Sequence, residues 1–327
     1  MLARSALVRQ RPSVARRLPL QLVPARLHHS SVAATQHGGP VGNPSHRVYF
    51  SHDNVPLSPW HDIPLVANAS TREYNMICEI PRWSNAKLEV DTSTPFNPIK
   101  QDSKNGRPRY VADIFPYKGY IWNYGAFPQT FEDPDHTDRD TGCVGDSDPV
   151  DVIEVGQAVC AEGSIHRVKL LGLVALIDDG ETDWKVLAIR SDDPMADRIQ
   201  DIQGLETHMP GLVSATVDWF SKYKVPDGKP LNSWAFGGQA KDADYAHSVI
   251  AATHKAWSRL IHSENETGFA LANTTVRTSP HYLSAGAASQ KLRALTGASL
   301  GQALAASAQA PAKWHYVHNG MVTNSSA

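Results

Sequence analysis

The first 52 residues of this chain contain no lysine, no aspartate and no glutamate. Those 52 residues hold seven arginines, and the first acid is Asp53. The arginines break up any secretory core of about 7–15 apolar residues. No apolar run in the sequence approaches the roughly 18 residues that a membrane-spanning helix needs, so we expect no integral membrane segment. An acid-free, arginine-rich start of this kind is typical of a transit peptide.

We assign residues 1–46 to a mitochondrial transit peptide followed by a linker. Arginine outweighs serine in this segment, which favours mitochondrial import, to the matrix, over plastid import. Residues 26–31 are the expected neighbourhood of cleavage. Residues 32–46 contain Gly-Gly-Pro and other turn-forming residues and are expected to form a flexible linker. A disordered basic tail without a targeting role is the alternative.

Cysteine is scarce, and positive charge is scarce outside the leader. The three cysteines are Cys78, Cys143 and Cys160, with no Cys-x-x-Cys pair, which argues against a disulfide framework or a zinc site. After residue 52 the chain carries 24 of its 31 lysines and arginines against all 33 acids. An acidic body argues against nucleic acid as a partner, because phosphate backbones attract basic faces.

Short segments of β type dominate the first part of the folded body, which we place at residues 47–263. They lie at 74–80, 87–90, 108–111, 151–155, 166–177 and 184–189. Glycine and proline occur at short intervals between these segments, which favours a small barrel of antiparallel strands. Two helices are predicted after them, one starting at Pro210 and one over about 241–262. Residues 264–327 are expected to form a tail that docks partly, through residues 313–317.

Carboxylates gather in two segments, and the first has a distinctive spacing. Between residues 130 and 193 there are sixteen acids but five lysines or arginines. In a strand-like geometry Asp146 and Asp148 share one side of the chain. Pro149 then bends the chain, so that Asp151 can rejoin them.

The second acidic segment is residues 178–185, which read Asp-Asp-Gly-Glu-Thr-Asp-Trp-Lys and predict a turn between two strands. Two unit charges about 4 Å apart repel by about 4 kcal/mol at an effective dielectric near 20. Several carboxylates in one pocket therefore need cations, and hard divalent ions such as Mg²⁺ prefer oxygen ligands. The alternative is a set of solvated turns that never converge.

Other acidic and catalytic motifs fit less well. An EF-hand loop needs a third oxygen ligand where Val150 stands. The sequence has no Walker loop, no Gly-x-Gly-x-x-Gly and no His-Glu-x-x-His. A nucleotide-sugar transferase that uses an Asp-x-Asp remains a rival enzyme class, although no nucleoside pocket can be recognised.

Basic and phenolic side chains along the body are candidate partners for an anionic substrate. Arginine offers a rigid fork to phosphate oxygens, lysine a point charge, and tyrosine a neutral donor. Each lysine taken alone is more often a solvated surface residue. The candidates are Lys87, Arg109, Tyr120, Tyr124, Lys185, Tyr223, Lys224 and Lys229.

Six ordered segments of the body resemble family I soluble inorganic pyrophosphatases, most closely the eukaryotic, fungal-type branch and its mitochondrial form. They are 79–83 (Glu-Ile-Pro-Arg-Trp), 85–89 (Asn-Ala-Lys-Leu-Glu), 119–130, 145–151, 180–185 and 223–229 (Tyr-Lys-Val-Pro-Asp-Gly-Lys). The likeness covers roughly residues 47–260, and the last sixty residues diverge. It implies a mainly β (α+β) fold, a distorted five-stranded OB-like barrel with flanking helices, and a homodimer.

The same resemblance implies an activity and a role for each site residue. The expected enzyme is an inorganic diphosphatase that hydrolyses pyrophosphate to two orthophosphates. It would use several Mg²⁺ ions and an activated water, without a covalent intermediate. The implied metal ligands are Asp146, Asp151, Asp183, Glu89 and Asp178, with Asp151 bridging two ions. The implied substrate-binding residues are Lys87, Arg109, Tyr124, Tyr223 and Lys224. The implied catalytic residues are Asp148 as the base, with Tyr120 and Arg109, and Glu79 and Lys185 support the cavity. The rival interpretation is a related scaffold without turnover.

Overall fold

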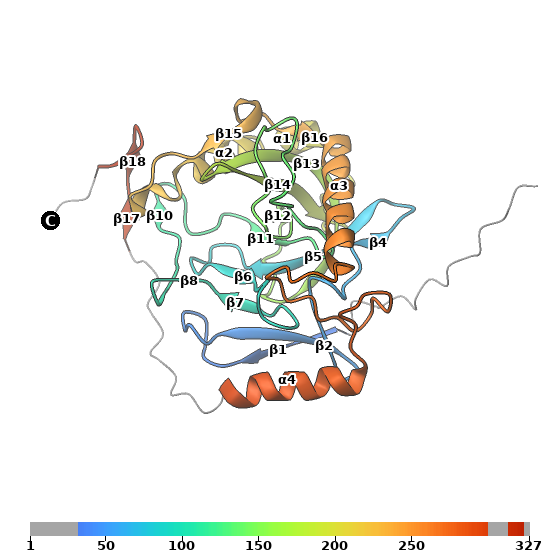
Figure 1. Cartoon of the computed structure of the whole chain (residues 1–327). Helices are drawn as coiled ribbons and strands as arrows, with labels where there is room; N and C mark the ends of the chain where they lie inside the picture. The colour runs from blue at the N-terminus through green and yellow to red at the C-terminus, as the bar shows by residue number, and fades with distance from the viewer. Residues whose placement is uncertain (1–31, 300–312, 324–327) are drawn as a thin grey trace, which may run out of the picture.

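Five strands close into a barrel at the centre of the molecule (Figure 1). The computed structural model describes residues 32–299 and 313–323 of the chain. The ring runs β5–β11–β12–β14–β13, and it closes because β13 also pairs with β5. Its strands are β5 (Glu73–Ile80), β11 (Asn123–Ala126), β12 (Asp151–Glu154), β13 (Ile165–Asp178) and β14 (Glu181–Arg190). The predicted class, a mainly β fold around a five-stranded barrel with flanking helices, is confirmed.

Successive residues of the barrel strands face two different cores, because side chains alternate along a strand. Ile77 and Leu187 lie in the main core cluster. Their neighbours Met76 and Val186 lie in a second cluster, which also contains the buried residues of the first half of α3 (Ala243–Ile261). With both faces covered, the strands read as apolar runs, which is why the sequence predicts them well.

Shorter elements extend the barrel sheet and cover one end of it. The strands are β4 (Val66–Asn68), β15 (Ser233–Trp234) and β16 (Lys241–Asp242), and the helical turns are η2 (Val225–Asp227) and η3 (Ala235–Gly238). Helix α1 (Ile202–His208) was not predicted; the Asp201 carboxylate caps it by accepting from Gly204 N at 2.6 Å. Helix α2 (Leu212–Lys222) begins just after the predicted Pro210, since Gly211 precedes it at φ 85°.

A second sheet lies beside the barrel, and its edge strand corrects the predicted linker. The sheet order is β1–β2–β7–β6, with β3 also on β2. Its strands are β1 (Val32–His37), β2 (Arg47–His52), β3 (Val55–Leu57), β6 (Leu88–Val90) and β7 (Ile99–Gln101). Residues 32–37 are therefore not a flexible linker. They pair antiparallel with β2, because Gly38 at φ 73° turns the chain back and His46 Nδ1 bonds Gly39 O at 3.0 Å.

The C-terminal residues pack more tightly than the predicted loose tail. Helix α4 (Ala285–Ser299) lies across the second sheet in Figure 1, and its Ala288 and Leu292 share a cluster with Tyr49 and Phe96. The connection to the body is polar as well, since Asp62 accepts hydrogen bonds from the backbone N–H groups of residues 274 and 275, each at 2.8 Å. Apolar contacts and one buried carboxylate thus fasten this segment.

Residues 313–323 return to the body on the side away from α4 (Figure 1). Strand β17 (Trp314–His315) pairs in parallel with β10 (Asp113–Ile114). The last short strands are β8 (Ser103–Lys104), β9 (Arg107–Pro108), β18 (Val317–His318) and β19 (Met321–Val322). The predicted docking segment 313–317 therefore includes a paired strand.

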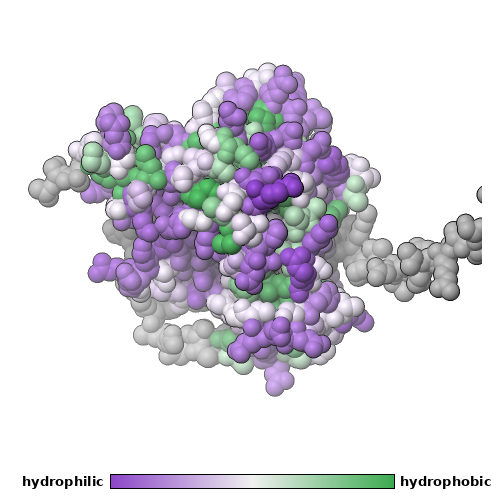
Figure 2. All heavy atoms as spheres, turned by 45° about the horizontal axis from the view of Figure 1, so that its top comes forward, coloured by the Kyte–Doolittle hydropathy of each residue, from purple (hydrophilic) through white to green (hydrophobic). Residues whose placement is uncertain are grey.

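Two of the sequence predictions concern membranes and targeting. Among the described residues, none of the helices has both the length and the apolar character needed to cross a membrane. The surface in Figure 2 is polar over most of the face drawn, with small apolar patches. The predicted transit peptide, residues 1–31 of the leader, lies outside the described residues.

Candidate active site

Thirteen of the fourteen predicted site residues line one polar cavity of about 240 Å³, which we call the acidic cup. They are Glu79, Lys87, Glu89, Tyr120, Tyr124, Asp146, Asp148, Asp151, Asp178, Asp183, Lys185, Tyr223 and Lys224. The fourteenth, Arg109, adjoins the cup through Asp102. The convergence that the sequence argument required is therefore present.

The turn that carries Asp146 and Asp148 is pressed against the segment before it. Gly145 allows this, because a Cβ there would lie 2.3 Å from the carbonyl carbon of Glu132. Ser147 adopts a left-handed φ of 76°, and Asp148 N donates to Asp146 Oδ1 at 3.0 Å. The turn is held by the backbone as well as by its own side chains, so both carboxylates face the cup.

The hairpin between β13 and β14 supplies the opposite wall of the cup. Gly180, at φ 95°, makes the turn, and Asp178 ends β13 just before it. Asp183 and Lys185 are two residues apart on β14, so they project from the same face. In the register of the barrel Asp151 lies beside Lys185, which brings the two acidic segments together.

Lys185 joins three side chains at the floor of the cup. Its Nζ donates to Tyr124 Oη at 2.8 Å, to Asp183 Oδ1 at 2.6 Å, and to Asp151. Burial opposes the charge of this lysine, but Asp151 and Asp183 overcome that and raise its pKa well above its usual range. Lys185 is therefore cationic and partly neutralises these two aspartates.

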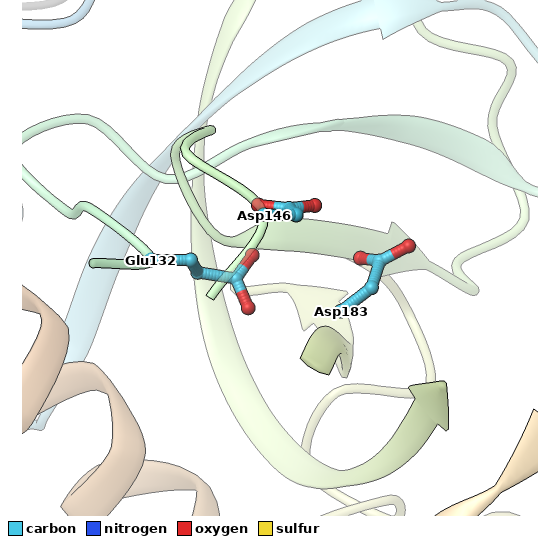
Figure 3. A group of neighbouring side chains, drawn as sticks. All are labelled: Glu132, Asp146 and Asp183. Atoms are coloured by element: carbon cyan, nitrogen blue, oxygen red, sulfur yellow. The ribbon is translucent and has the colours of Figure 1, made fainter. Parts of the chain in front are cut away.

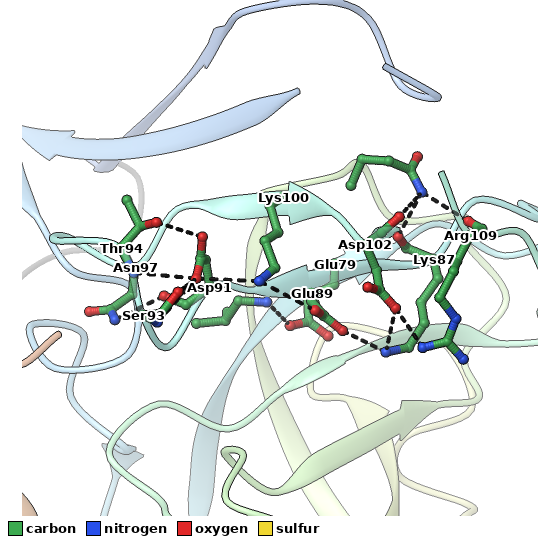
Figure 4. A network of polar contacts seen from close by, with 12 residues as sticks. Glu79, Lys87, Glu89, Asp91, Ser93, Thr94, Asn97, Lys100, Asp102 and Arg109 are labelled. Carbon is green, nitrogen blue, oxygen red and sulfur yellow. Dashed lines mark hydrogen bonds and ion pairs between the residues drawn. The ribbon is translucent and has the colours of Figure 1, made fainter. Parts of the chain in front are cut away.

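The remaining cationic and phenolic groups pair with acids at the rim. Lys224 bonds Asp178, whose Oδ2 also accepts from Tyr223 Oη at 3.0 Å. Figure 4 shows a second network, in which Lys87 contacts Glu89 at 2.5 Å.

Asp102 extends the network of Figure 4 to the residue outside the cup lining. Its Oδ2 lies 3.2 Å from Lys87 Nζ and 2.7 Å from Arg109 Nη1. Each predicted phosphate-binding cation is thus positioned by a carboxylate and held near the cup without substrate.

Tyr120 and Glu79 are buried in the wall of the cup. The Tyr120 ring packs at 5.2 Å from Tyr124 and 5.1 Å from Trp219, and burial raises its pKa. Glu79 Oε1 accepts from Val90 N at 2.7 Å, and burial raises the pKa of Glu79, with Asp151 adding to the effect. Glu79 therefore supports the wall of the cup through its bond to the backbone of Val90. Tyr120 lines the cavity as a neutral phenol.

Two carboxylates of the cup and Glu132, which lines another cavity, form a candidate metal site. Oxygens of Glu132, Asp146 and Asp183 lie within 4.8 Å of one another, and Figure 3 shows the three groups turned toward a common space. Burial and mutual repulsion raise the pKa of Asp146 well above its usual range and that of Asp183 to about 7. A donor set made only of oxygens, with an excess of negative charge, fits a hard divalent cation.

Comparison with known proteins agrees with this geometry. The profile of the inorganic pyrophosphatase family matches residues 76–258. The inorganic pyrophosphatase of Drosophila melanogaster is 51% identical over 259 residues, 78% of this chain and 76% of the relative. This chain belongs to the family I soluble inorganic pyrophosphatases.

Two solved structures share the fold of this pyrophosphatase. The inorganic pyrophosphatase of Schistosoma japonicum superposes with a TM-score of 0.78 at 42% identity, covering 87% of this chain and 100% of that one. The N-terminally truncated vacuolar soluble pyrophosphatase of Trypanosoma cruzi, solved in complex with PPi, gives 0.65 at 38% identity, covering 76% and 99%. The chain is an inorganic diphosphatase, which hydrolyses inorganic pyrophosphate.

The sequence analysis missed two carboxylates of this pyrophosphatase site. Glu132 faces Asp146 and Asp183, and Asp102 links Lys87 to Arg109. A signal for Glu132 was present, since it follows the matching segment 119–130 by two residues. Asp102 stands beside no other acid and offers no local pattern, so it emerges only from the fold.

Proposed function

We propose that this pyrophosphatase is magnesium-dependent and that an activated water attacks pyrophosphate directly, without a covalent enzyme intermediate. The observation that carries the proposal is the acidic cup itself, in which acids of two distant segments face cationic groups across one cavity. The complex of the Trypanosoma cruzi relative with PPi supports pyrophosphate as the substrate of this site.

Five carboxylates of the cup are the proposed metal ligands. Asp146, Asp151 and Asp183 would hold the first ion, with Asp151 shared by a second, while Glu89 and Asp178 would take ions that arrive with substrate. Bound Mg²⁺ would lower the pKa of a water and polarise phosphoryl oxygens. The ligands are oxygens only, which suits magnesium better than softer metals.

Asp148 is the proposed general base. Asp148 lines the cup and is solvent-exposed, but desolvation of its carboxyl group by surrounding atoms, and repulsion from Glu89, raise its pKa to about 7. A base with a pKa near the working pH is well matched to accepting the proton of an attacking water. The adjacent aspartates bind cations, whereas Asp148 orients the water and takes its proton.

The cations and phenols would hold the two phosphoryl groups. Lys87 and Arg109 approach from the side of Asp102, and Tyr223 and Lys224 approach from the side of Asp178. Phosphate oxygens would replace or share these carboxylate partners as charge builds on the leaving group. Tyr124 would donate from the floor, and Tyr120 is placed to orient an oxygen.

Phosphate release tests this proposal. Purified residues 32–327 are incubated with pyrophosphate and Mg²⁺, and orthophosphate is followed over time. Acid quench during a single turnover distinguishes the routes, because direct attack leaves every side chain unphosphorylated. No release would favour the scaffold interpretation. Trapping of a phosphorylated side chain after acid quench would contradict direct attack.

A mitochondrial, matrix location is a further part of the proposal. It is supported by the seven arginines and the absence of acids in residues 1–52. A fluorescent protein fused to residues 1–50 should enter mitochondria, and a matched fusion with the arginines before residue 31 replaced by glutamine should stay in the cytosol. Cytosolic signal from the unaltered fusion would contradict targeting.

A homodimer is proposed from the family resemblance, and exposed aromatic residues support it. Trp83 is 57% exposed and Phe115 54% exposed, and the Phe115 ring lies 5.3 Å from Tyr316 and 5.9 Å from Trp314. Exposed aromatic groups of this kind are enriched at subunit contacts. Light scattering after gel filtration should give twice the chain mass, and a monomer at micromolar concentration would refute the dimer.

A further inference from the structure

The acids around Asp183 differ in whether the protein supplies them with a counter-charge. Lys185 Nζ bonds Asp183 and Asp151. Glu132 and Asp146 lie close to Asp183, and among the described residues neither forms an ion pair with a lysine or arginine. The protein thus supplies a cation to Asp151 and Asp183, and leaves Glu132 and Asp146 to a cation from solution.

Glu132 is held rigidly, yet one of its oxygens has no partner. The side chain is buried, and Oε1 accepts from Trp184 N at 2.9 Å. Oε2 is shielded from solvent and has no hydrogen-bond partner. The backbone is clamped as well, since Glu132 N donates to Asp148 O and Ser147 N donates to Glu132 O, each at 2.9 Å.

An unpartnered buried carboxylate oxygen points to a missing ligand. Leaving such a group unsatisfied is costly, and buried polar atoms in folded proteins nearly always have a partner. The Glu132 carboxylate faces those of Asp146 and Asp183 (Figure 3), so repulsion and lack of a donor act together. A divalent cation or a water in its coordination shell would relieve both.

We propose that Glu132 is a positioning residue for the metal ion that Asp146 and Asp183 share. Glu132 holds that ion, directly or through a coordinated water, against Asp146 and Asp183. It also fixes the turn that carries Asp148 through its backbone bonds. The inference rests on the proposed metal dependence and adds a residue to it, since Glu132 is outside the ligand set implied by the family resemblance.

The decisive variant is Glu132→Gln, compared with Asp133→Asn as a matched control. Both replace an acid by its isosteric amide at adjacent positions. Asp133 is outside the three-carboxylate cluster and bonds Arg259 at 3.0 Å. The glutamine keeps an acceptor for Trp184 N and removes the charge that faces the metal. Mn²⁺ binding to the full chain without substrate is measured by electron paramagnetic resonance at constant ionic strength.

The expected result is a weakening of the tightest Mn²⁺ site by about 10–100-fold in Glu132→Gln and by less than about twofold in Asp133→Asn. In the absence of metal, Glu132→Gln should melt at the same or a higher temperature than the wild type, because one of three repelling charges is gone. A residue with a purely structural role would instead lower the metal-free melting temperature and leave Mn²⁺ affinity unchanged, which would overturn the inference.

Glu132→Asp keeps the inference testable if the glutamine variant misfolds. It retains the charge on a shorter side chain, so it should bind Mn²⁺ more tightly than a neutral variant and more weakly than the wild type. Wild-type Mn²⁺ affinity in this variant together with a lowered metal-free melting temperature would overturn the inference. The wild type tests the proposed function separately, since failure to bind Mn²⁺ or to hydrolyse pyrophosphate would refute metal dependence itself.

Discussion

The acidic cup and the outer layer of β1, β2 and α4 use side chains in opposite ways. In the cup, Asp146, Asp148 and Asp183 crowd together with pKa values raised by burial and repulsion. In the outer layer, residues such as Tyr49 and Phe96 are packed by apolar contact. The cup therefore stores unfavourable electrostatic energy that metal and substrate release, whereas the outer layer contributes stability without chemistry.

This contrast predicts that variants of the two regions affect different quantities, and the largest effect is expected in the cup. Asp148→Asn should lower kcat by about 10²–10⁴-fold, because it removes the general base while keeping the shape of the side chain. Mg²⁺ affinity and melting temperature should not fall. Steady-state phosphate release measures this, with the exposed Asp135→Asn as control. A near-normal kcat would remove Asp148 from the base role.

A second cup variant should act first on metal binding. Asp151→Ala removes the proposed bridging ligand, so the Mg²⁺ concentration for half-maximal activity should rise by about tenfold or more. Mg²⁺ titration of pyrophosphate hydrolysis measures this. Lys185 keeps Asp183 and Tyr124 as partners, so the fold should persist. An unchanged titration would refute the bridging assignment.

The pH dependence of the melting temperature of the metal-free protein tests whether the carboxylates of the cup repel one another in the folded state. The pKa of Asp148 is about 7 in the folded protein, above the ordinary value near 3.9 of an unfolded chain. The folded state therefore holds the proton more tightly, and ionisation of Asp148 costs stability as pH rises from about 4 to 7. In EDTA, Asp148→Asn should melt above the wild type at pH 8.

That difference should shrink as pH falls and vanish near pH 4, where Asp148 is protonated in both states. Comparing the two proteins cancels the titration of buried histidines such as His61. Melting curves at four or five pH values would show the trend. An equal gap at pH 8 and pH 5 would mean that Asp148 does not carry a raised pKa.

The smallest effect is expected in the outer layer. Leu292→Ala on α4 removes a partly buried side chain from the cluster around Phe96, and should lower the free energy of unfolding by about 1–2 kcal/mol. The kcat and Mg²⁺ response should match the wild type, and the exposed Lys291→Ala serves as control. A change in kcat would show that the outer layer is coupled to the cup. Denaturant unfolding and phosphate release measure the two quantities.

The helices and strands that were predicted well are those whose apolar pattern in sequence matches their burial in the fold. Strands β13 and β14 are apolar runs buried on both sides, and α3 has helical periodicity facing the barrel. By contrast, β1 reads Val-Ala-Ala-Thr-Gln-His and resembles a linker. It is a strand because an edge strand is held by main-chain hydrogen bonds, which any sequence without proline can make.

Among the site residues, local pattern separates those that were predicted from those that were missed. The spacing of Asp146, Asp148 and Asp151 within six residues favours a shared carboxylate site, and the family resemblance implies a role for each of them. Glu132 has acidic neighbours in sequence, Asp133 and Asp135, but neither belongs to its carboxylate cluster. It enters the site because Gly145 lets two backbones approach closely, a contact between segments that no local pattern encodes.

The sequence by itself determined the residue types of this pyrophosphatase: which positions carry charge, which runs are apolar, and where turns interrupt them. Those properties are local, so they can be read along the chain. Only the tertiary structure decided which charges meet, because closure of β13 onto β5 sets distances between segments far apart in sequence. It brought Glu132 close to Asp183, the same aspartate that Lys185 bonds.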